Sequence, residues 1–234
     1  MNSDYRELPP VIDETIIERA LQFGTAELCD GMKDLGIAGN GAMDFEIMPL
    51  DENLKMAGTA MTVDTREGDN FPIHVAIYSS KPGYVLVVGG KGCKDRAYLG
   101  DLMGGASKAI GLNGIVVDGC VRDRLGLKSM HLPVFSKGFN QNSPIKKGPG
   151  KINTPVECAG ITVYPGDLVV GDCDGVTVVP RDRIEDVLNA AEAKLDYEKK
   201  RRQAIAEYEK SRNEGSENLP DLSPKWVKDM LENG

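Results

Sequence analysis

Three charged residues, Asp101, Arg122 and Asp123, have the types and the spacing to act together on one ligand. Twenty residues separate Asp101 from the adjacent pair Arg122 and Asp123. An arginine can hold a carboxylate or a developing oxyanion, and an aspartate can hold a hard metal ion. The alternative is structural, because Arg122 and Asp123 could form a surface ion pair and Asp101 could cap a helix.

The segment from Gly100 to Asp123 reads as loop, helix, strand and loop. Small residues at helical density follow Asp101, and an apolar run at 115–117 leads to Arg122 and Asp123. Open α/β folds usually bind ligands at the carboxyl ends of their strands. The first N–H groups of the helix, from Leu102 and Met103 on, could bind an anion there. The sequence therefore predicts one cleft that holds three polar side chains and a helix N-terminus.

Other polar residues near this segment have simpler interpretations. A helix that opens at 68–70 contains His74, which we interpret as packed or surface-capping rather than catalytic. Lys91 and Lys94 follow an apolar strand at 83–90 and could form a Schiff base, but nothing in the sequence indicates the desolvation that would lower a lysine pKa. We interpret both lysines as solvated or substrate-steering charges. The segment 139–151 predicts a loop that could act as a lid.

The remaining strands and an acidic cluster lie on either side of this region. Residues 56–63 predict a strand, and 160–172 with 175–180 predict hairpin strands. Asp167, Asp172 and Asp174 fall in that hairpin, but their spacing does not fit a calcium-binding loop. Turn chemistry accounts for these three aspartates, and we do not interpret them as a metal site.

Composition narrows the possible functions. The chain has 234 residues, is 41% hydrophobic and carries a net charge of −8, which disfavours non-specific nucleic-acid binding. No stretch is long and apolar enough for a membrane span, and the first residues lack a signal pattern, so we expect a cytoplasmic protein. Five cysteines without a CxxC pair indicate reduced thiols. Two histidines predict that any metal site is rich in oxygen ligands, which favours Mg²⁺ or Mn²⁺.

Helices are predicted at both ends of the chain. A helix follows Asp13, and Thr25 is the predicted N-cap of a second one. Residues 181–214 contain neither proline nor glycine and predict a long helix, whose apolar stripe is interrupted by Glu198 and Arg202. Either this helix leaves the core near Leu195 and becomes solvated, or the stripe crosses to a neighbouring subunit with Glu198 pointing at a cleft. The tail from 215 has a one-sided apolar set suited to docking.

The spacing of Asp101, Arg122 and Asp123 resembles the D-x20-R-D motif of the RraA-like family. That family includes 4-hydroxy-4-methyl-2-oxoglutarate and 4-carboxy-4-hydroxy-2-oxoadipate aldolases and the regulator of ribonuclease activity A. Four stretches, one of which contains this motif, resemble family blocks in the same order, and the resemblance covers about residues 12–180. The stretches are 25–30, 58–76, 100–136 and 160–180.

The resemblance implies an α/β protein with the swivelling β/β/α fold, assembled as homotrimers or as hexamers made of two trimers. It also implies a pyruvate aldolase that depends on a divalent metal ion, Mg²⁺ or Mn²⁺, and acts on a small 2-oxo acid. Such a site should also decarboxylate oxaloacetate, because both reactions pass through the pyruvate enolate.

The same resemblance implies a role for each residue of the motif. Asp123 would hold the metal directly or through water, and Asp101 would position water on the metal. Arg122 would hold the oxyanion or the carboxylate of the pyruvyl half, and the N–H groups of Leu102 and Met103, which follow Gly100, would bind the substrate carboxylate. Aldolases of the family resemble this chain in their C-terminal extension, which lends a glutamate to the adjacent subunit. Glu198 is the best positional match, with Glu192 and Glu207 as alternatives.

We predict an α/β core with N-terminal helices over residues 1–180 and a C-terminal helical arm over 181–234 that belongs to the same domain and contacts another subunit. Two other functions remain open at this point. One is a non-catalytic regulator that binds a ribonuclease or another protein. The other is a methyltransferase, which the absence of a glycine-rich nucleotide loop after a first strand disfavours. Neither nucleic acid nor membrane is expected as a partner.

Overall fold

The structure is a computed structural model that describes residues 3–233. The chain divides into two compact units, the first up to Ala191 and the second from Glu192 onward. The first unit contains the sheet and most of the helices, and the second is helical. The expected α/β fold with a long C-terminal helix is confirmed. The predicted division at 180 and 181 stays a prediction, as does the contact with another subunit.

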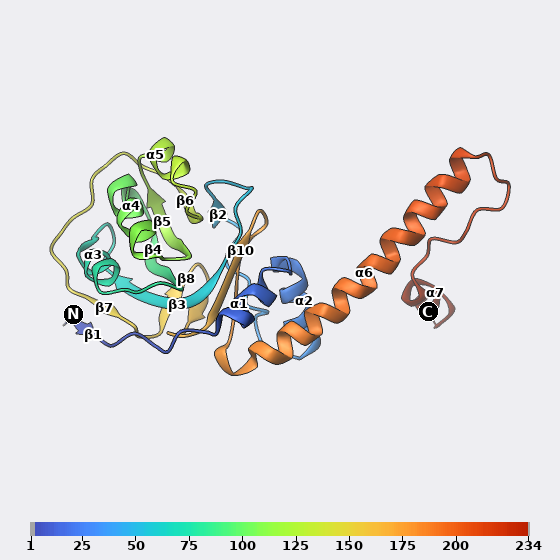
Figure 1. Ribbon diagram of the computed structural model, residues 1–234, viewed down its shortest axis with the longest axis horizontal. Coiled ribbons are helices and arrows are strands. Elements are labelled where there is room, and N and C mark those ends of the chain that lie inside the picture. The colour runs from blue at the N-terminus through green and yellow to red at the C-terminus, as the bar shows by residue number, and fades with distance from the viewer. Residues whose placement is uncertain (1–2, 234) are drawn as a thin grey trace. The chain divides into compact units, whose positions relative to one another are not determined.

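Four parallel strands form the centre of the sheet, in the order β3, β4, β5, β6 (Figure 1). They are β3 (Met56–Thr65), β4 (Tyr84–Ala97), β5 (Gly114–Val121) and β6 (Val134–Phe139). The helices that connect them are α3 (Phe71–Tyr78), α4 (Asp101–Ile110) and α5 (Arg124–Ser129). Every residue of β5 is buried, as expected for a parallel strand that is covered on both faces. The connecting helices therefore begin where the strands end, at the carboxyl edge of the sheet.

The remaining strands are short. Strand β10 pairs antiparallel with both β3 and β11, which confirms the predicted hairpin, and β8 and β9 form a separate two-stranded sheet. Edge pairs link β1 to β7, β7 to β3, and β2 to β6. The bounds are β1 (Asp4–Tyr5), β2 (Met48–Pro49), β7 (Gly150–Ile152), β8 (Val156–Cys158), β9 (Ile161–Val163), β10 (Leu168–Asp172) and β11 (Gly175–Val179). Two apolar clusters fill the unit, one on each face of the central strands.

Two helices precede the sheet, α1 (Glu14–Ala20) and α2 (Thr25–Asp34). The helix predicted after Asp13 is confirmed, and Asp13 caps it, because its carboxylate accepts the Thr15 N–H at 3.0 Å. The prediction that Thr25 caps α2 is wrong. Thr25 is the first helical residue, the N-cap position belongs to Gly24, and the Thr25 N–H is bound at 2.8 Å by the carboxylate of Asp172.

A 3₁₀ turn, η1 (Arg181–Arg183), leads into the long helix α6 (Ile184–Asn213). The buried residues of α6 all lie in its first turns, and they are Ile184, Val187, Leu188 and Ala191. The helix therefore loses its buried face even earlier than the predicted point near Leu195.

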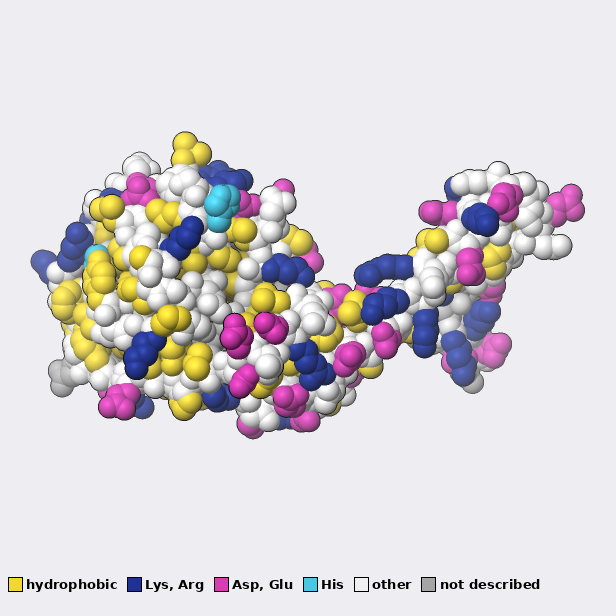
Figure 2. Space-filling model, in the orientation of Figure 1, with side chains coloured by type: hydrophobic (Ala, Val, Ile, Leu, Met, Phe, Trp, Pro, Cys, Tyr) yellow, Lys and Arg dark blue, Asp and Glu magenta, His cyan; other side chains and the backbone are white. Residues whose placement is uncertain are grey.

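The second unit consists of the rest of α6 and the helix α7 (Lys225–Asn233). Ion pairs one turn apart run along this part of α6, for example between Asp196 and Lys199 at 3.5 Å. Figure 2 shows acidic and basic side chains interspersed along it. Within residues 3–233, no helix is long and apolar enough to cross a membrane.

Candidate functional site at the carboxyl edge of the sheet

A cleft of about 340 Å³ opens at the carboxyl edge of the sheet, between the start of α4 and the end of β5. It contains every residue of the predicted core site except Glu198: Gly100, Asp101, Leu102, Met103, Arg122 and Asp123. The structure therefore brings Asp101 together with the adjacent pair Arg122 and Asp123, although twenty residues separate them in the chain.

Backbone contacts hold the two halves of the cleft in register. The Arg122 N–H donates to the Leu99 carbonyl at 3.0 Å, so the segment that leaves β5 lies beside the segment that enters α4. Asp101 is the first residue of α4, and its N–H points at the Asp123 carboxylate, with 3.4 Å between N and Oδ2. The first N–H groups of a helix have no partner within the helix, and they lie at the positive end of its dipole. An anion in the cleft would meet these groups.

Asp123 has an unusual backbone. Its φ of 57° and ψ of 46° place it in the left-handed region, where a residue other than glycine costs energy, although aspartate tolerates it better than most. This conformation turns the chain between β5 and α5 and leaves the carboxylate partly exposed in the cleft. Oδ2 of Asp123 lies 3.4 Å from Nε of Arg122. Backbone strain of this kind is common at functional sites.

Two glycines allow the close packing around the aspartates. A Cβ atom on Gly100 would lie 2.1 Å from Oδ2 of Asp123, which is far inside contact distance. A Cβ atom on Gly126 would lie 2.8 Å from the Cβ of Asp101. Neither position has room for a side chain, so both glycines are required for the observed placement of the carboxylates.

The segment between β6 and β7 forms one wall of the cleft and holds Arg122 from the side opposite Asp123. The Nη1 of Arg122 donates to the Ser143 hydroxyl at 2.8 Å, and Nη1 of Arg96 donates to the Ser143 carbonyl, also at 2.8 Å. Asn142 contributes a carbonyl to the Ala97 N–H at 3.0 Å. These contacts fix the loop to the end of β4. The sequence alone had left open that the loop acts as a lid.

Beyond the motif and Ser143, the polar residues that line the cleft are Asn70, His74 and Lys146. Asn70 is 1% exposed; its Nδ2 donates to the Tyr98 carbonyl at 2.9 Å, and its Oδ1 has no hydrogen-bond partner among the described residues. Asn70 is the last residue of the turn at 68–70 and the N-cap of α3, and the sequence indicated only that a helix starts there.

His74 lies on α3 and faces the same cleft. Partial burial, and then the charge of Lys146, lower the pKa of His74 below its usual value of 6.5. A neutral imidazole, which can accept a proton, is therefore the dominant form at neutral pH. The imidazole also stacks on the ring of Tyr78, with 6.0 Å between the centroids. The interpretation of His74 as packed or surface-capping rather than catalytic stays a prediction.

The two lysines after β4 have other partners. Lys91 Nζ lies 2.6 Å from the Asp64 carboxylate and donates to the Thr65 carbonyl at 2.9 Å. Lys94 Nζ lies 3.7 Å from the Glu46 carboxylate. Neither lysine lines the cleft, and neither is desolvated in the way a Schiff-base lysine requires.

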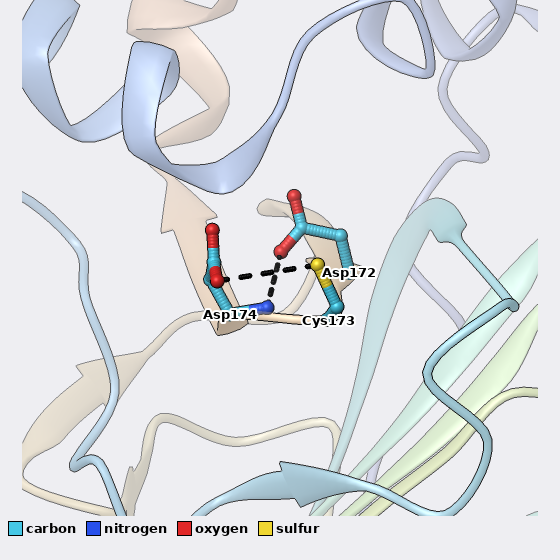
Figure 3. Close-up of side chains that lie close together, drawn as sticks. All are labelled: Asp172, Cys173 and Asp174. Atoms are coloured by element: carbon cyan, nitrogen blue, oxygen red, sulfur yellow. Dashed lines mark hydrogen bonds between the residues drawn. The ribbon is translucent and has the colours of Figure 1, made fainter.

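The acidic cluster at the β10–β11 turn has a structural role (Figure 3). Asp172 accepts the Thr25 N–H and the Thr25 hydroxyl, both at 2.8 Å, and the Asp174 N–H at 3.0 Å. Asp167 accepts the N–H groups of Tyr164 and Arg181, while its burial raises the pKa of its carboxyl group. Ligand atoms of Asp172, Cys173 and Asp174 lie within 4.8 Å of one another, but the hydrogen bonds of Asp172 explain the arrangement.

The donors in the cleft suit a hard divalent cation. Asp123 and Asp101 both line it, and the side chain of Asp123 is 39% exposed. Mg²⁺ is usually held by one or two carboxylates and keeps several of its waters, so this donor set fits it. The missing side chain at Gly100 leaves the space that Oδ2 of Asp123 occupies. Among the described lining residues, His74 is the one softer nitrogen donor.

Glu198 lies in the second unit. Its carboxylate pairs with Arg202 one turn further along α6. Its predicted role at a neighbouring subunit's cleft stays a prediction.

Comparison with known proteins identifies the family. Residues 25–178 match the family model described as "Aldolase/RraA", RraA-like. The chain belongs to the RraA-like family. The match spans both aspartates and the arginine of the cleft.

Relatives within the family carry different names. The chain is 42% identical to a protein of Halalkalibacterium halodurans named "Putative 4-hydroxy-4-methyl-2-oxoglutarate aldolase", over 69% of this chain and 77% of that protein. It is 35% identical to an uncharacterized protein of Methanocaldococcus jannaschii, over 83% of this chain and 93% of the relative. The crystal structure of Streptomyces coelicolor RraAS2, described as an unusual member of the RNase ES inhibitor RraA protein family, superposes with a TM-score of 0.73 at 27% identity. That superposition covers 84% of this chain and 98% of the other.

Proposed function

We propose that this RraA-like protein is a pyruvate aldolase that cleaves 4-hydroxy-4-methyl-2-oxoglutarate or a similar 2-oxo acid with the help of a divalent metal ion. One observation carries the proposal: Asp101, Arg122, Asp123 and the first N–H groups of α4 meet at a single cleft. The names of the aldolase relatives support it. Oxaloacetate decarboxylation is proposed as a side activity of the same cleft.

The residues of the cleft meet the demands of breaking a carbon–carbon bond beta to a ketone. The carboxylate of the pyruvyl half binds at the N–H groups of Leu102 and Met103, where the helix dipole favours negative charge. Arg122 lies beside this position, and its guanidinium stabilises the negative charge that grows on the ketone oxygen as the enolate forms. Charge stabilisation that increases toward the transition state is what accelerates the reaction.

A proton must leave the C4 hydroxyl as the bond breaks, and another must later reach C3 of the enolate. Asp101 and His74 line the cleft and are the groups available to take and return protons, directly or through water. Asp123 would hold Mg²⁺ or Mn²⁺. When bound, the metal would act as a Lewis acid that polarises the ketone and lowers the energy of the enolate.

The test is pyruvate release from 4-hydroxy-4-methyl-2-oxoglutarate and from oxaloacetate, with Mg²⁺, with EDTA, and with Asp123→Ala. We expect turnover that requires both the metal and Asp123. Glu52→Ala is the matched control, because Glu52 is an exposed carboxylate in a turn away from the cleft. Turnover that survives EDTA would contradict the metal requirement.

Turnover of neither substrate would reject the proposed activity. The Streptomyces relative is described as a member of an RNase inhibitor family, so a regulatory protein that binds a ribonuclease would then become the next hypothesis. Activity of this chain with a metal would make that alternative unnecessary.

A further inference from the structure

A second hollow lies next to the cleft and shares two of its residues. It has a volume of about 280 Å³ and is lined by Arg122, Asp123, Arg124, Phe139, Asn140 and Gln141. The main cleft contains Arg122 and Asp123 as well. A ligand held at this pair can therefore extend into the hollow, so that its two ends occupy two different pockets.

Arg124 is the group in the hollow that can recognise a ligand. It is the first residue of α5, directly after Asp123, and it is exposed. Its guanidinium carbon lies 4.7 Å from the centroid of the Phe139 ring, a cation–π contact that fixes the position of the charged group. Because the side chain is already ordered, binding an anion there costs less conformational entropy than it would for a free arginine.

The charges around the hollow leave Arg124 available. Asp123 is the one carboxylate among the lining residues, and it is already 3.4 Å from Nε of Arg122. Among residues 3–233, no carboxylate lies within ion-pair distance of Arg124. Asn140 has both ends of its side chain engaged, since Nδ2 donates to the Lys94 carbonyl and Oδ1 accepts the Asn142 N–H. Arg124 is thus an ordered cation with a free face beside the proposed reaction site.

We propose that this hollow is a subsite for the distal carboxylate of a 2-oxo dicarboxylic acid, and that Arg124 is the residue that binds it. The inference rests on the proposed function, since it places the pyruvyl half at α4 and Arg122. The half that leaves as the second product then lies over Phe139 with its carboxylate on Arg124. Arg124 determines specificity, because it makes dicarboxylic substrates bind more tightly than monocarboxylic ones of the same length.

Lys146 is the competing cation, because it lines the main cleft but not the hollow. If the distal carboxylate lay there, the hollow at Arg124 would have no part in recognition. The two arrangements differ in which single substitution removes the preference for a second carboxylate.

The experiment compares two ligands of equal carbon number that cannot undergo aldol cleavage. They are 2-oxoglutarate, which carries a distal carboxylate, and 2-oxopentanoate, which has a methyl group in its place. Calorimetry with Mg²⁺ present gives the dissociation constant of each. For the unchanged protein we expect 2-oxoglutarate to bind about tenfold more tightly, the size of one charge-assisted hydrogen-bonded contact at a partly exposed site.

Four variants locate the contact. Arg124→Gln is expected to remove the tenfold preference by weakening 2-oxoglutarate alone, and Arg124→Lys to restore part of it, because the charge returns without the fork of a guanidinium. Phe139→Leu is expected to reduce the preference, since the guanidinium loses the ring that fixes it. Lys146→Gln is expected to leave the ratio of the two constants unchanged. Thermal unfolding of each variant checks that it is folded.

The outcomes separate this inference from the proposed function. If Arg124→Gln keeps the preference, or if Lys146→Gln removes it, the subsite at Arg124 is wrong. If the unchanged protein binds both acids equally, the subsite is wrong, but the proposed binding of the pyruvyl half is not contradicted. If it binds neither acid, the 2-oxo acid function fails together with the subsite.

Discussion

The Arg122 guanidinium is held between two oxygen atoms from different parts of the chain: Nη1 donates to the Ser143 hydroxyl at 2.8 Å, and Nε lies 3.4 Å from the Asp123 carboxylate. The two contacts fix the plane of the guanidinium. Ser143 is itself held by Arg96, which binds its carbonyl at 2.8 Å. In the proposed reaction the serine therefore acts through the arginine, as a positioning residue.

Removing the Ser143 hydroxyl should weaken substrate binding through Arg122. We expect Ser143→Ala to raise KM for oxaloacetate about three- to tenfold, the range of one hydrogen bond with a charged donor at a partly exposed site, and to change kcat less. Ser143→Thr keeps a hydroxyl and should restore most of the loss. The matched control is Ser129→Ala, since the Ser129 hydroxyl donates to the Gly126 carbonyl on the exposed side of α5. A normal KM for Ser143→Ala would show that Asp123 alone orients the arginine.

Gly100 should not tolerate even a methyl group. In Gly100→Ala the new Cβ would lie 2.1 Å from Oδ2 of Asp123 and 3.0 Å from Cγ of Arg122, so the carboxylate must move. We expect activity to fall at least about a hundredfold, because displacements on the order of 1 Å at a reacting centre cost this much. Steady-state pyruvate release measures it.

Gly105 provides the control for that substitution. It lies on the same helix, and a Cβ there would be 3.7 Å from Cε of Met130, an ordinary contact. Gly105→Ala should keep activity and raise the free energy of unfolding by about 0.5–1 kcal/mol, since alanine is the better helix former. Equal activity of both variants would contradict the steric argument at Gly100.

These contacts show which parts of the site could be predicted from sequence. The order of helix, strand and charged pair between 100 and 123 follows from local periodicity, and the structure confirms it with α4 and β5. The cap of α2 could not be found in this way. Its carboxylate, Asp172, lies 147 residues further along the chain, and a local pattern holds no information about such a contact.

Contacts between residues far apart in the chain also form the rest of the cleft wall. Asn70 and Lys146 reach the cleft because the loop after β6 crosses the start of α3, where the Asn70 N–H donates to the Ile145 carbonyl at 2.9 Å. His74 enters with α3, and its helical position alone does not show which face meets a ligand. Strand order and loop anchoring decide these contacts, and they become visible only in three dimensions.

The pKa of His74 should depend on Lys146. The folded protein lowers this pKa below 6.5, mainly through burial and then through the lysine charge. We expect NMR titration to give a midpoint below 6.5 and Lys146→Gln to raise it, because a repelling positive charge is removed. Lys147→Gln is the control, as Lys147 is the neighbouring lysine and is not a lining residue. An unchanged midpoint in Lys146→Gln would show that burial alone sets the pKa.

The lowered pKa of His74 also predicts how the free energy of unfolding changes with pH. Between the lowered pKa of folded His74 and 6.5, the unfolded chain binds more protons at this residue than the folded chain does. The contribution of His74 to the free energy of unfolding is therefore complete above pH 6.5 and is lost as the pH falls through that window. Replacement of His74 by glutamine should reduce the loss of stability across this window, as measured by thermal unfolding in matched buffers.

Asp172 should be the most sensitive of the aspartates at the β10–β11 turn. It is 5% exposed, and its carboxylate accepts two hydrogen bonds from Thr25 that join the turn to the start of α2 and one from Asp174 within the turn. In Asp172→Ala the Thr25 N–H and hydroxyl lose their acceptor inside the protein, so we expect a loss of about 2–3 kcal/mol in the free energy of unfolding. Asp172→Asn keeps one acceptor oxygen but turns an amide toward the other donor, which should give an intermediate loss.

Asp174 is the matched control, because it lies in the same turn and its carboxylate is exposed. Asp174→Ala should change the free energy of unfolding by less than about 0.5 kcal/mol, as is usual for a surface substitution. Urea unfolding measures all three variants. The capping role predicts that adding Mg²⁺ leaves the ranking of the variants unchanged, whereas a metal site at this turn would make both alanine variants lose a metal-dependent part of their stability.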